Sequence, residues 1–202
     1  MIAGNFSGTP LDMGTKVDML KAMRPRSRLL DYGCSWGYGT HQFVREGFEA
    51  VGFEISQRRA VYGREMLGLE IISDMEQLKL LPQGSFDIIF SHHVLEHLQD
   101  IRTTFEAMAY LLADDGFFFH VLPNFTGRMA RTGMWLKWIG EEHPLAPTMD
   151  FFRIALPEFG FKRVFFASSP FDEGLTTALG DLQWKSTQTD GDELLCVASR
   201  RS

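Results

Sequence analysis

The first residues of this chain that could do chemistry form a glycine-rich stretch directly after a short apolar run. Gly33, Gly37 and Gly39 can adopt positive φ, and without a Cβ they let a ligand approach the backbone closely. Glu54 follows Asp31 by roughly 20 residues, the distance at which an acidic side chain of a βαβ unit reaches the ribose hydroxyls of a bound nucleotide. Together these residues favour a site for an adenosine-containing cofactor.

Histidine is the side chain best suited to accept a proton near neutral pH, and the chain has six histidines. His92 and His93 follow the fourth apolar run, so either could line a pocket at that edge of a sheet. His143 lies in a long segment from which a loop could deliver it to the same place. We therefore rank His93 and His143 as the candidate general bases, and the alternative is that each only lines a pocket or lies on the surface.

The spacing of His93 and His97 at i, i+4 would suit two metal ligands on one helical face. No glutamate of the zinc-peptidase pattern follows His93, and no third ligand is evident. We therefore expect no metal site, and we expect Glu96 and His97 to hold a local turn. We interpret His41 and His120 as structural.

Short apolar runs alternate with helical patterns along the chain, which is typical of a parallel sheet covered by helices on both faces. The expected strands are 28–32, 50–53, 70–72, 86–91, 116–122, 161–167 and 193–199. The expected helices are 38–46, 57–67, 101–112 and 148–159. The fold class predicted from this rhythm is a doubly wound α/β domain.

The length of 202 residues favours one domain over residues 1–202. Residues 1–23, with a weak helical pattern over 15–23, form either a lid or a packing segment. Residues 123–147 are an insertion near the expected acceptor site, and 168–192 is a second long connection. The insertion interleaves cations with large apolar side chains, which would suit an acceptor that is anionic and partly apolar, or else a helix that caps the sheet.

Composition narrows the class of protein. A net charge of −6 argues against a nucleic-acid partner, since such partners are held largely by Lys and Arg. No apolar run is long enough to span a bilayer and the first residues lack a signal-peptide pattern, so we expect a cytoplasmic protein. Cys34 and Cys196 lie in no metal or redox spacing, and we expect both to be buried as small apolar side chains.

Four motifs in order resemble the class I S-adenosylmethionine-dependent methyltransferases, in particular the branch of ubiquinone and menaquinone biosynthesis. They are Leu-Leu-Asp-Tyr-Gly-Cys-Ser-Trp-Gly at 29–37, Gly-Phe-Glu-Ile-Ser at 52–56, Ser-Phe-Asp-Ile-Ile at 85–89 and Val-Leu-Glu-His-Leu at 94–98. The resemblance covers roughly residues 29–161. It implies a Rossmann-like sheet of seven strands in the order 3-2-1-4-5-7-6, mostly parallel with the last strand antiparallel.

The resemblance also implies a role for each matching residue. Glu54 would bind the ribose, Ile55 would pack on the adenine, and Asp74 with Met75 would lie near the adenine edge, although the chain around them is less similar to the family. The remaining cofactor-binding residues would be Asp31, Gly33, Cys34, Ser35, Gly37 and Ser91.

The resemblance has one departure, Ser35, which stands where the family has glycine and is followed by the bulky Trp36. A serine keeps the turn if its φ is negative, so we expect a modified cofactor pocket and not a lost one.

The reaction implied is methyl transfer to a small-molecule acceptor, with oxygen favoured over nitrogen or carbon as the attacked atom. Three alternatives stay open at this point. A nucleic-acid methyltransferase is disfavoured because the Asn/Asp-Pro-Pro-aromatic turn is absent after residue 91. A non-catalytic S-adenosylmethionine-binding partner of another subunit has the same fold. A nicotinamide-dependent oxidoreductase would explain the glycine-rich turn but not the other motifs. The oligomeric state is not predicted.

Overall fold

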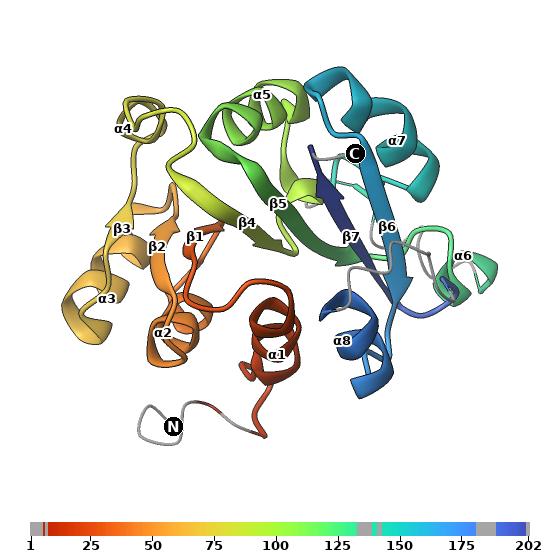
Figure 1. The fold of residues 1–202 in the computed structure, drawn as a ribbon, viewed down its shortest axis with the longest axis horizontal. Helices are drawn as coiled ribbons and strands as arrows, with labels where there is room; N and C mark the ends of the chain where they lie inside the picture. The colour runs from red at the N-terminus through yellow and green to blue at the C-terminus, as the bar shows by residue number, and fades with distance from the viewer. Residues whose placement is uncertain (1–5, 7, 133–138, 141–142, 181–188, 201–202) are drawn as a thin grey trace.

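The computed structural model describes residues 6, 8–132, 139–140, 143–180 and 189–200. Its centre is one sheet in the order β3-β2-β1-β4-β5-β7-β6 (Figure 1). The strands are β1 (Arg28–Tyr32), β2 (Glu49–Phe53), β3 (Ile71–Ile72), β4 (Phe86–His92), β5 (Leu112–Pro123), β6 (Arg163–Ser168) and β7 (Glu193–Ser199). Strand β7 runs antiparallel to both β5 and β6, and the pairs among β1 to β5 are parallel. The predicted order and the antiparallel last strand are confirmed.

The helices lie on both faces of this sheet (Figure 1). They are α1 (Gly14–Met23), α2 (Tyr38–Arg45), α3 (Gln57–Leu67), α4 (Met75–Lys79), α5 (Ile101–Leu111), α6 (Arg128–Arg131), α7 (Met149–Ala155) and α8 (Glu173–Gly180). Two 3-10 turns complete the described elements, η1 (Leu95–His97) and η3 (Leu156–Phe159).

Consecutive side chains of the central strands alternate between two apolar cores, as the period of a strand requires. Leu29 and Ile88 pack on the face covered by α1, α2 and α8, whereas Leu30 and Ile89 pack on the face covered by α4, α5 and α7. Because β1 and β4 are buried on both faces, their carboxyl ends are held rigidly at one edge of the sheet. The motifs that are predicted to bind a cofactor begin at that edge.

Apart from shifts of one or two residues at the ends of elements, such as β6 starting at Arg163 and not at 161, the structure differs from the predicted elements in three ways. The helix expected at 148–159 ends at Ala155 and continues as the 3-10 turn η3, because Pro157 has no N–H to donate. The strand expected from residue 116 starts earlier, at Leu112, and pairs with β4 across a register shift. Helices α4, α6 and α8 were not predicted; each has eight residues or fewer, too short for a clear periodic pattern.

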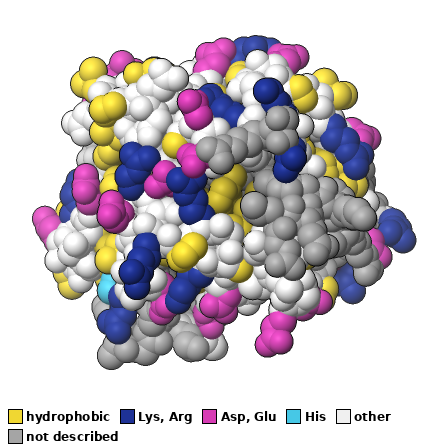
Figure 2. Space-filling view, in the orientation of Figure 1, with side chains coloured by type: hydrophobic (Ala, Val, Ile, Leu, Met, Phe, Trp, Pro, Cys, Tyr) yellow, Lys and Arg dark blue, Asp and Glu magenta, His cyan; other side chains and the backbone are white. Residues whose placement is uncertain are grey.

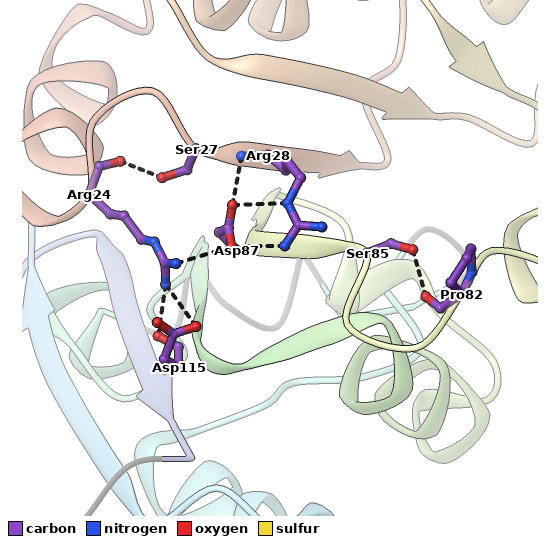
Figure 3. Close-up of polar contacts among 7 residues, drawn as sticks. All are labelled: Arg24, Ser27, Arg28, Pro82, Ser85, Asp87 and Asp115. Carbon is purple, nitrogen blue, oxygen red and sulfur yellow. Dashed lines mark hydrogen bonds and ion pairs between the residues drawn. The ribbon is translucent and has the colours of Figure 1, made fainter.

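Asp87, the aspartate of the Ser-Phe-Asp motif, connects β4 to Arg28 of β1 and to Arg24 (Figure 3). These contacts lie at the edge of the sheet opposite the carboxyl ends of the parallel strands. The two carboxylate oxygens of Asp87 accept hydrogen bonds from the Arg28 backbone and guanidinium at 3.0 to 3.2 Å. Arg24, just after α1, bonds the same carboxylate at 3.1 Å and also pairs with Asp115 at 3.3 Å. Burial alone would raise the pKa of Asp87, but the Arg28 hydrogen bonds and the two cations outweigh burial and lower this pKa.

Replacing Asp87 with alanine is expected to reduce the free energy of unfolding by about 2 kcal/mol at pH 7, because two arginines lose a partly buried charged acceptor. Since the folded pKa is the lower one, the contribution of Asp87 is present above the unfolded pKa and is lost as the pH falls through the folded pKa. Urea denaturation at pH 7 and at pH 3 should therefore show the difference between wild type and variant shrinking in acid.

Asp150→Ala is the matched control, because the Asp150 side chain is 82% exposed and pairs with Arg153 on its own helix. It should change the free energy of unfolding by less than about 0.5 kcal/mol. Equal losses in the two variants would contradict a special role for Asp87.

Candidate functional site

A cavity of about 450 Å³ opens at the carboxyl ends of the central strands. It is bounded by the ends of β1 and β2 with the turns that follow them, and by the turn after β4. Its lining residues are Tyr32, Gly33, Ser35, Phe53, Glu54, Ile55, Arg59, His92, His93, Val94, His97 and Leu98. One end thus carries the glycine-rich turn and Glu54, the other carries histidines, and both open into the same space.

The turn after β1 has a shape that requires glycine. Gly33 has φ +82°, and a Cβ built there would lie 2.4 Å from Cγ2 of Val94, so no larger residue fits without moving the opposite wall. The Gly33 and Cys34 N–H groups donate to the Phe53 carbonyl at 2.8 and 3.0 Å, which ties the turn to the end of β2. Gly37, at φ +85°, is the N-cap residue that precedes α2. The turn is therefore held in one shape by close packing and backbone hydrogen bonds, and we call this turn the cradle.

Ser35 adopts φ +53°, so the expected negative φ is wrong. In this left-handed conformation the Ser35 N–H donates a hydrogen bond to Oε2 of Glu54 at 3.0 Å. That bond to a charged acceptor offsets the modest strain of a left-handed serine. The serine therefore keeps the turn by a different conformation from the one predicted, and it lines the cavity.

Glu54 is 7% exposed and lies at the end of β2 inside the cavity lining. Its other oxygen, Oε1, accepts from the Ser56 N–H at 2.8 Å. Each carboxylate oxygen keeps a second lone pair, the acceptor that a ribose hydroxyl needs. Ile55 beside it is 72% exposed, an apolar side chain with room for a planar ring against it. The cradle without a Cβ, the fixed carboxylate and the exposed Ile55 together fit an adenosine-containing cofactor.

Several predicted cofactor residues support this cavity without lining it. Asp31 is buried under the turn, where its carboxylate accepts from Thr40 Oγ1 at 2.6 Å, and burial raises its pKa to about 6. Cys34 is buried against Gly52, and burial raises the pKa of its thiol, as expected for an apolar role. Cys196 is likewise buried, within β7.

The two residues predicted near the adenine edge, Asp74 and Met75, make structural contacts of their own. The Asp74 side chain caps α4 by accepting from the Glu76 N–H at 2.9 Å, and Met75 packs against the core beneath that helix. Neither belongs to the cavity lining, and neither does Ser91, whose hydroxyl is buried without a partner among the described residues. The low similarity of this stretch to the family agrees with the placement of Asp74 and Met75.

At the histidine end of the cavity, Glu193 contacts both His92 and His93, and it is not among the site residues predicted from the sequence. Oε1 of Glu193, the first residue of β7, lies 2.9 Å from Nε2 of His93 and 3.4 Å from Nε2 of His92. Glu193 was assigned only to a strand. The predicted strand order could have located Glu193 near the histidines. An antiparallel β7 beside β5 begins at the edge of the sheet where the parallel strands end. Burial lowers the pKa of His92, so its imidazole is neutral near pH 7.

His143 is brought to the same region, although it is not part of the cavity lining. Its ring lies 4.5 Å from that of His97, centroid to centroid. Glu96 is fully buried beside them, neither of its carboxylate oxygens has a hydrogen-bond partner among the described residues, and burial raises its pKa. Of the histidines interpreted as structural, His120 is fully buried within β5, and burial lowers its pKa to about 3.

His93 and His97 each lie beside further side chains that could ligate a metal, which their spacing in the sequence does not show. His93 has His92 and Glu193 beside it, and His97 has Glu96 and His143, with one nitrogen or oxygen of each residue within 4.8 Å of the others in its group. These spacings would admit a cation. Hydrogen bonding among the side chains accounts for the first group as it stands, and we assign no metal to either.

The described surface and the described part of the insertion carry cationic and anionic side chains. On the face drawn in Figure 2, cationic and anionic side chains are interspersed over the described residues. Of the cations in the insertion, Arg128 is an exposed ion-pair partner of Asp192. Met134, Trp135, Lys137 and Trp138 lie outside the described residues. None of the described helices is long and apolar enough to cross a membrane.

Comparison with known proteins identifies relatives of this chain. The profile of a methyltransferase domain family matches residues 11–164. A ubiquinone biosynthesis O-methyltransferase of Caulobacter sp. (strain K31) is 30% identical over 156 residues, which cover 72% of this chain and 59% of that protein. One from Ralstonia nicotianae is 28% identical over 139 residues, covering 64% of this chain and 56% of that protein.

The chain spans less than two thirds of the length of the four curated relatives that it matches, between 19% and 59%. A SAM-dependent methyltransferase of Archaeoglobus fulgidus has a similar fold, with a TM-score of 0.66 at 17% identity over 93% of this chain and 94% of that one. At that identity the likeness establishes the fold.

Proposed function

This chain belongs to the methyltransferase domain family, whose cofactor is S-adenosylmethionine, and from that premise we propose that it methylates a hydroxyl oxygen of a small molecule. The observation that carries the proposal is the single cavity that joins Glu54 and Ile55 to His92 and His93. A nucleoside-binding end and a proton-accepting end share one space, which is the arrangement that such a reaction needs.

The chain's own residues would hold the cofactor at the end of the cavity formed by β1 and β2. Glu54 would accept hydrogen bonds from the ribose hydroxyls, Ile55 would pack on the adenine, and the turn from Gly33 to Gly37 would face the methionine part. When bound, S-adenosylmethionine supplies a methyl carbon whose bond to sulfur breaks, with its electron pair going to sulfur, as an acceptor lone pair forms the new bond. The protein contributes orientation and a dry site.

A hydroxyl acceptor must lose its proton as the oxygen–carbon bond forms, so a group at the histidine end has to accept that proton. We propose that His93, which lines the cavity, is the proton acceptor. His143, whose ring lies against that of His97, is the second candidate. The similarity to ubiquinone biosynthesis O-methyltransferases supports oxygen as the attacked atom. Tyr32, Phe53 and Leu98 in the same lining favour a partly apolar acceptor.

The proposal is tested with methyl-labelled S-adenosylmethionine and a panel of hydroxyl, amine and thiol acceptors. We expect label to enter hydroxyl compounds, and we expect His93→Gln to lower the turnover by about 100-fold or more, because general base catalysis is lost. Calorimetry should find the affinity for S-adenosylmethionine unchanged in this variant.

His41→Gln is the matched control, since His41 lies on α2 away from the cavity lining. It should leave turnover within about twofold of wild type. Transfer only to amines would refute the choice of oxygen, and full hydroxyl methylation by His93→Gln would refute the proposed role of His93.

A further inference from the structure

Glu193 and His93 come from distant parts of the chain, and the fold fixes both of their backbones. The Glu193 N–H donates to Ser169 Oγ at 2.9 Å, and its carbonyl accepts from the Ser169 N–H at 3.0 Å. The His93 N–H donates to the Val121 carbonyl of β5 at 2.9 Å. Because β7 pairs with β5 up to Pro123 opposite Glu193, the carboxylate arrives beside the imidazole through sheet register and not through a loop.

The backbone of His93 is itself unusual. Its φ is +53°, in the left-handed region that a residue with a Cβ rarely adopts. Such conformations persist where the surroundings enforce them, and they are frequent where a side chain must be aimed. In this conformation the ring faces Glu193 on one side and Glu96 on the other, and the His93 side chain stays 34% exposed at the cavity.

From this geometry we propose that Glu193 is a positioning residue that holds His93 in one tautomer, with Nε2 protonated and Nδ1 as the basic nitrogen. The inference rests on the proposed function for its catalytic meaning. The Nε2–H donates to Oε1 of Glu193 at 2.9 Å, a charge-assisted bond that fixes both the ring plane and the tautomer. A carboxylate that orients an imidazole base in this way lowers the cost of proton transfer.

Glu96 completes the arrangement on the other side of the ring. Its Oε1 lies 3.5 Å from His93 Nδ1, and this fully buried carboxylate has no hydrogen-bond partner among the described residues. When Nδ1 takes the proton of the acceptor hydroxyl, the ring becomes an imidazolium that lies between the carboxyl groups of Glu193 and Glu96. A carboxylate beside the ring stabilises that positive charge.

Other charged groups near the pair come from three further elements. Lys16 of α1 lies close enough to favour the ionised form of Glu193, and His92 shares the Glu193 oxygen at 3.4 Å. The buried His120 of β5 interacts electrostatically with both His92 and His93. None of these groups takes the place of Glu193 as the hydrogen-bond acceptor for Nε2 of His93.

The test uses the whole chain without acceptor, so that it does not depend on turnover. In proton NMR spectra of wild-type protein, with histidine nitrogens labelled, we expect a far-downfield N–H resonance assigned to Nε2 of His93. Glu193→Ala should abolish that resonance, whereas Glu193→Gln, whose amide oxygen can still accept, should keep it at a less downfield shift. A spectrum in which Glu193→Ala leaves the resonance in place overturns the inference.

Turnover then tests the catalytic meaning separately. On any acceptor that the wild type methylates, Glu193→Ala should lose about 100-fold in turnover and Glu193→Gln about tenfold, with S-adenosylmethionine affinity within twofold of wild type. Asp192→Ala, which removes the neighbouring carboxylate that pairs with Arg128, should change neither the resonance nor the turnover. Loss of the resonance with unchanged turnover would uphold the hydrogen bond but contradict the positioning role and the proposed base.

Discussion

Replacing Glu54 with glutamine is expected to weaken the binding of S-adenosylmethionine by about 100-fold. The wild-type carboxylate accepts from the Ser35 and Ser56 N–H groups and keeps lone pairs for the ribose. Glutamine has only one acceptor oxygen, and its NH₂ group would face an N–H donor. Each hydrogen bond to a charged group contributes about 1.5 to 3 kcal/mol, so a loss near 2.7 kcal/mol corresponds to this factor.

Calorimetric titration of wild type and variant measures the effect, and the chain offers a matched control. Glu49 begins the same strand that Glu54 follows, but its side chain is exposed at the opposite end. Glu49→Gln should bind S-adenosylmethionine with wild-type affinity. If Glu54→Gln binds as tightly as Glu49→Gln, the carboxylate does not hold the ribose.

Gly33→Ala is expected to damage both the fold and the site. An alanine at φ +82° costs about 1 kcal/mol in backbone strain, and its Cβ would lie 2.4 Å from Cγ2 of Val94. Overpacking of this kind adds about 1 to 3 kcal/mol, so the free energy of unfolding should fall by about 3 kcal/mol in total. Since Gly33 and Val94 both line the cavity, cofactor affinity should drop by more than tenfold as well.

Gly47→Ala separates strain from crowding, because Gly47 has φ +93° but nothing within 4 Å of the added Cβ. Urea denaturation should give a loss of about 1 kcal/mol for this variant, with unchanged cofactor affinity. Equal losses for the two alanine variants would mean that Val94 yields freely and that the cradle is not rigid.

The sequence predicts the sheet well because burial on both faces leaves a strong pattern. The strands Arg28–Tyr32 and Glu193–Ser199 and the helix Gln57–Leu67 lie at their predicted bounds. The order of the strands came from the family resemblance and is confirmed. The short helix capped by Asp74 was missed because one turn of helix is stabilised by its cap and its neighbours, not by its own periodicity.

The site residues also fall into those that the sequence could predict and those that it could not. Residues on one continuous turn, such as Gly33 and Ser35, could be predicted as a group because their spacing is local. Glu193 could not be paired with His93 from spacing, since 100 positions separate them and only the antiparallel register of β7 brings them together. The sign of φ at Ser35 was mispredicted because it depends on the bond from its N–H to Glu54, a tertiary contact.

We expect the cavity between Glu54 and His93 to hold the adenosine-containing cofactor next to the proton acceptor. A co-crystal structure with S-adenosylhomocysteine would locate the nucleoside. We expect the ribose hydroxyls within hydrogen-bond distance of Glu54, the adenine against Ile55, and the sulfur facing the histidine end. A nucleoside bound elsewhere, or a sulfur directed away from His92 and His93, would contradict this expectation.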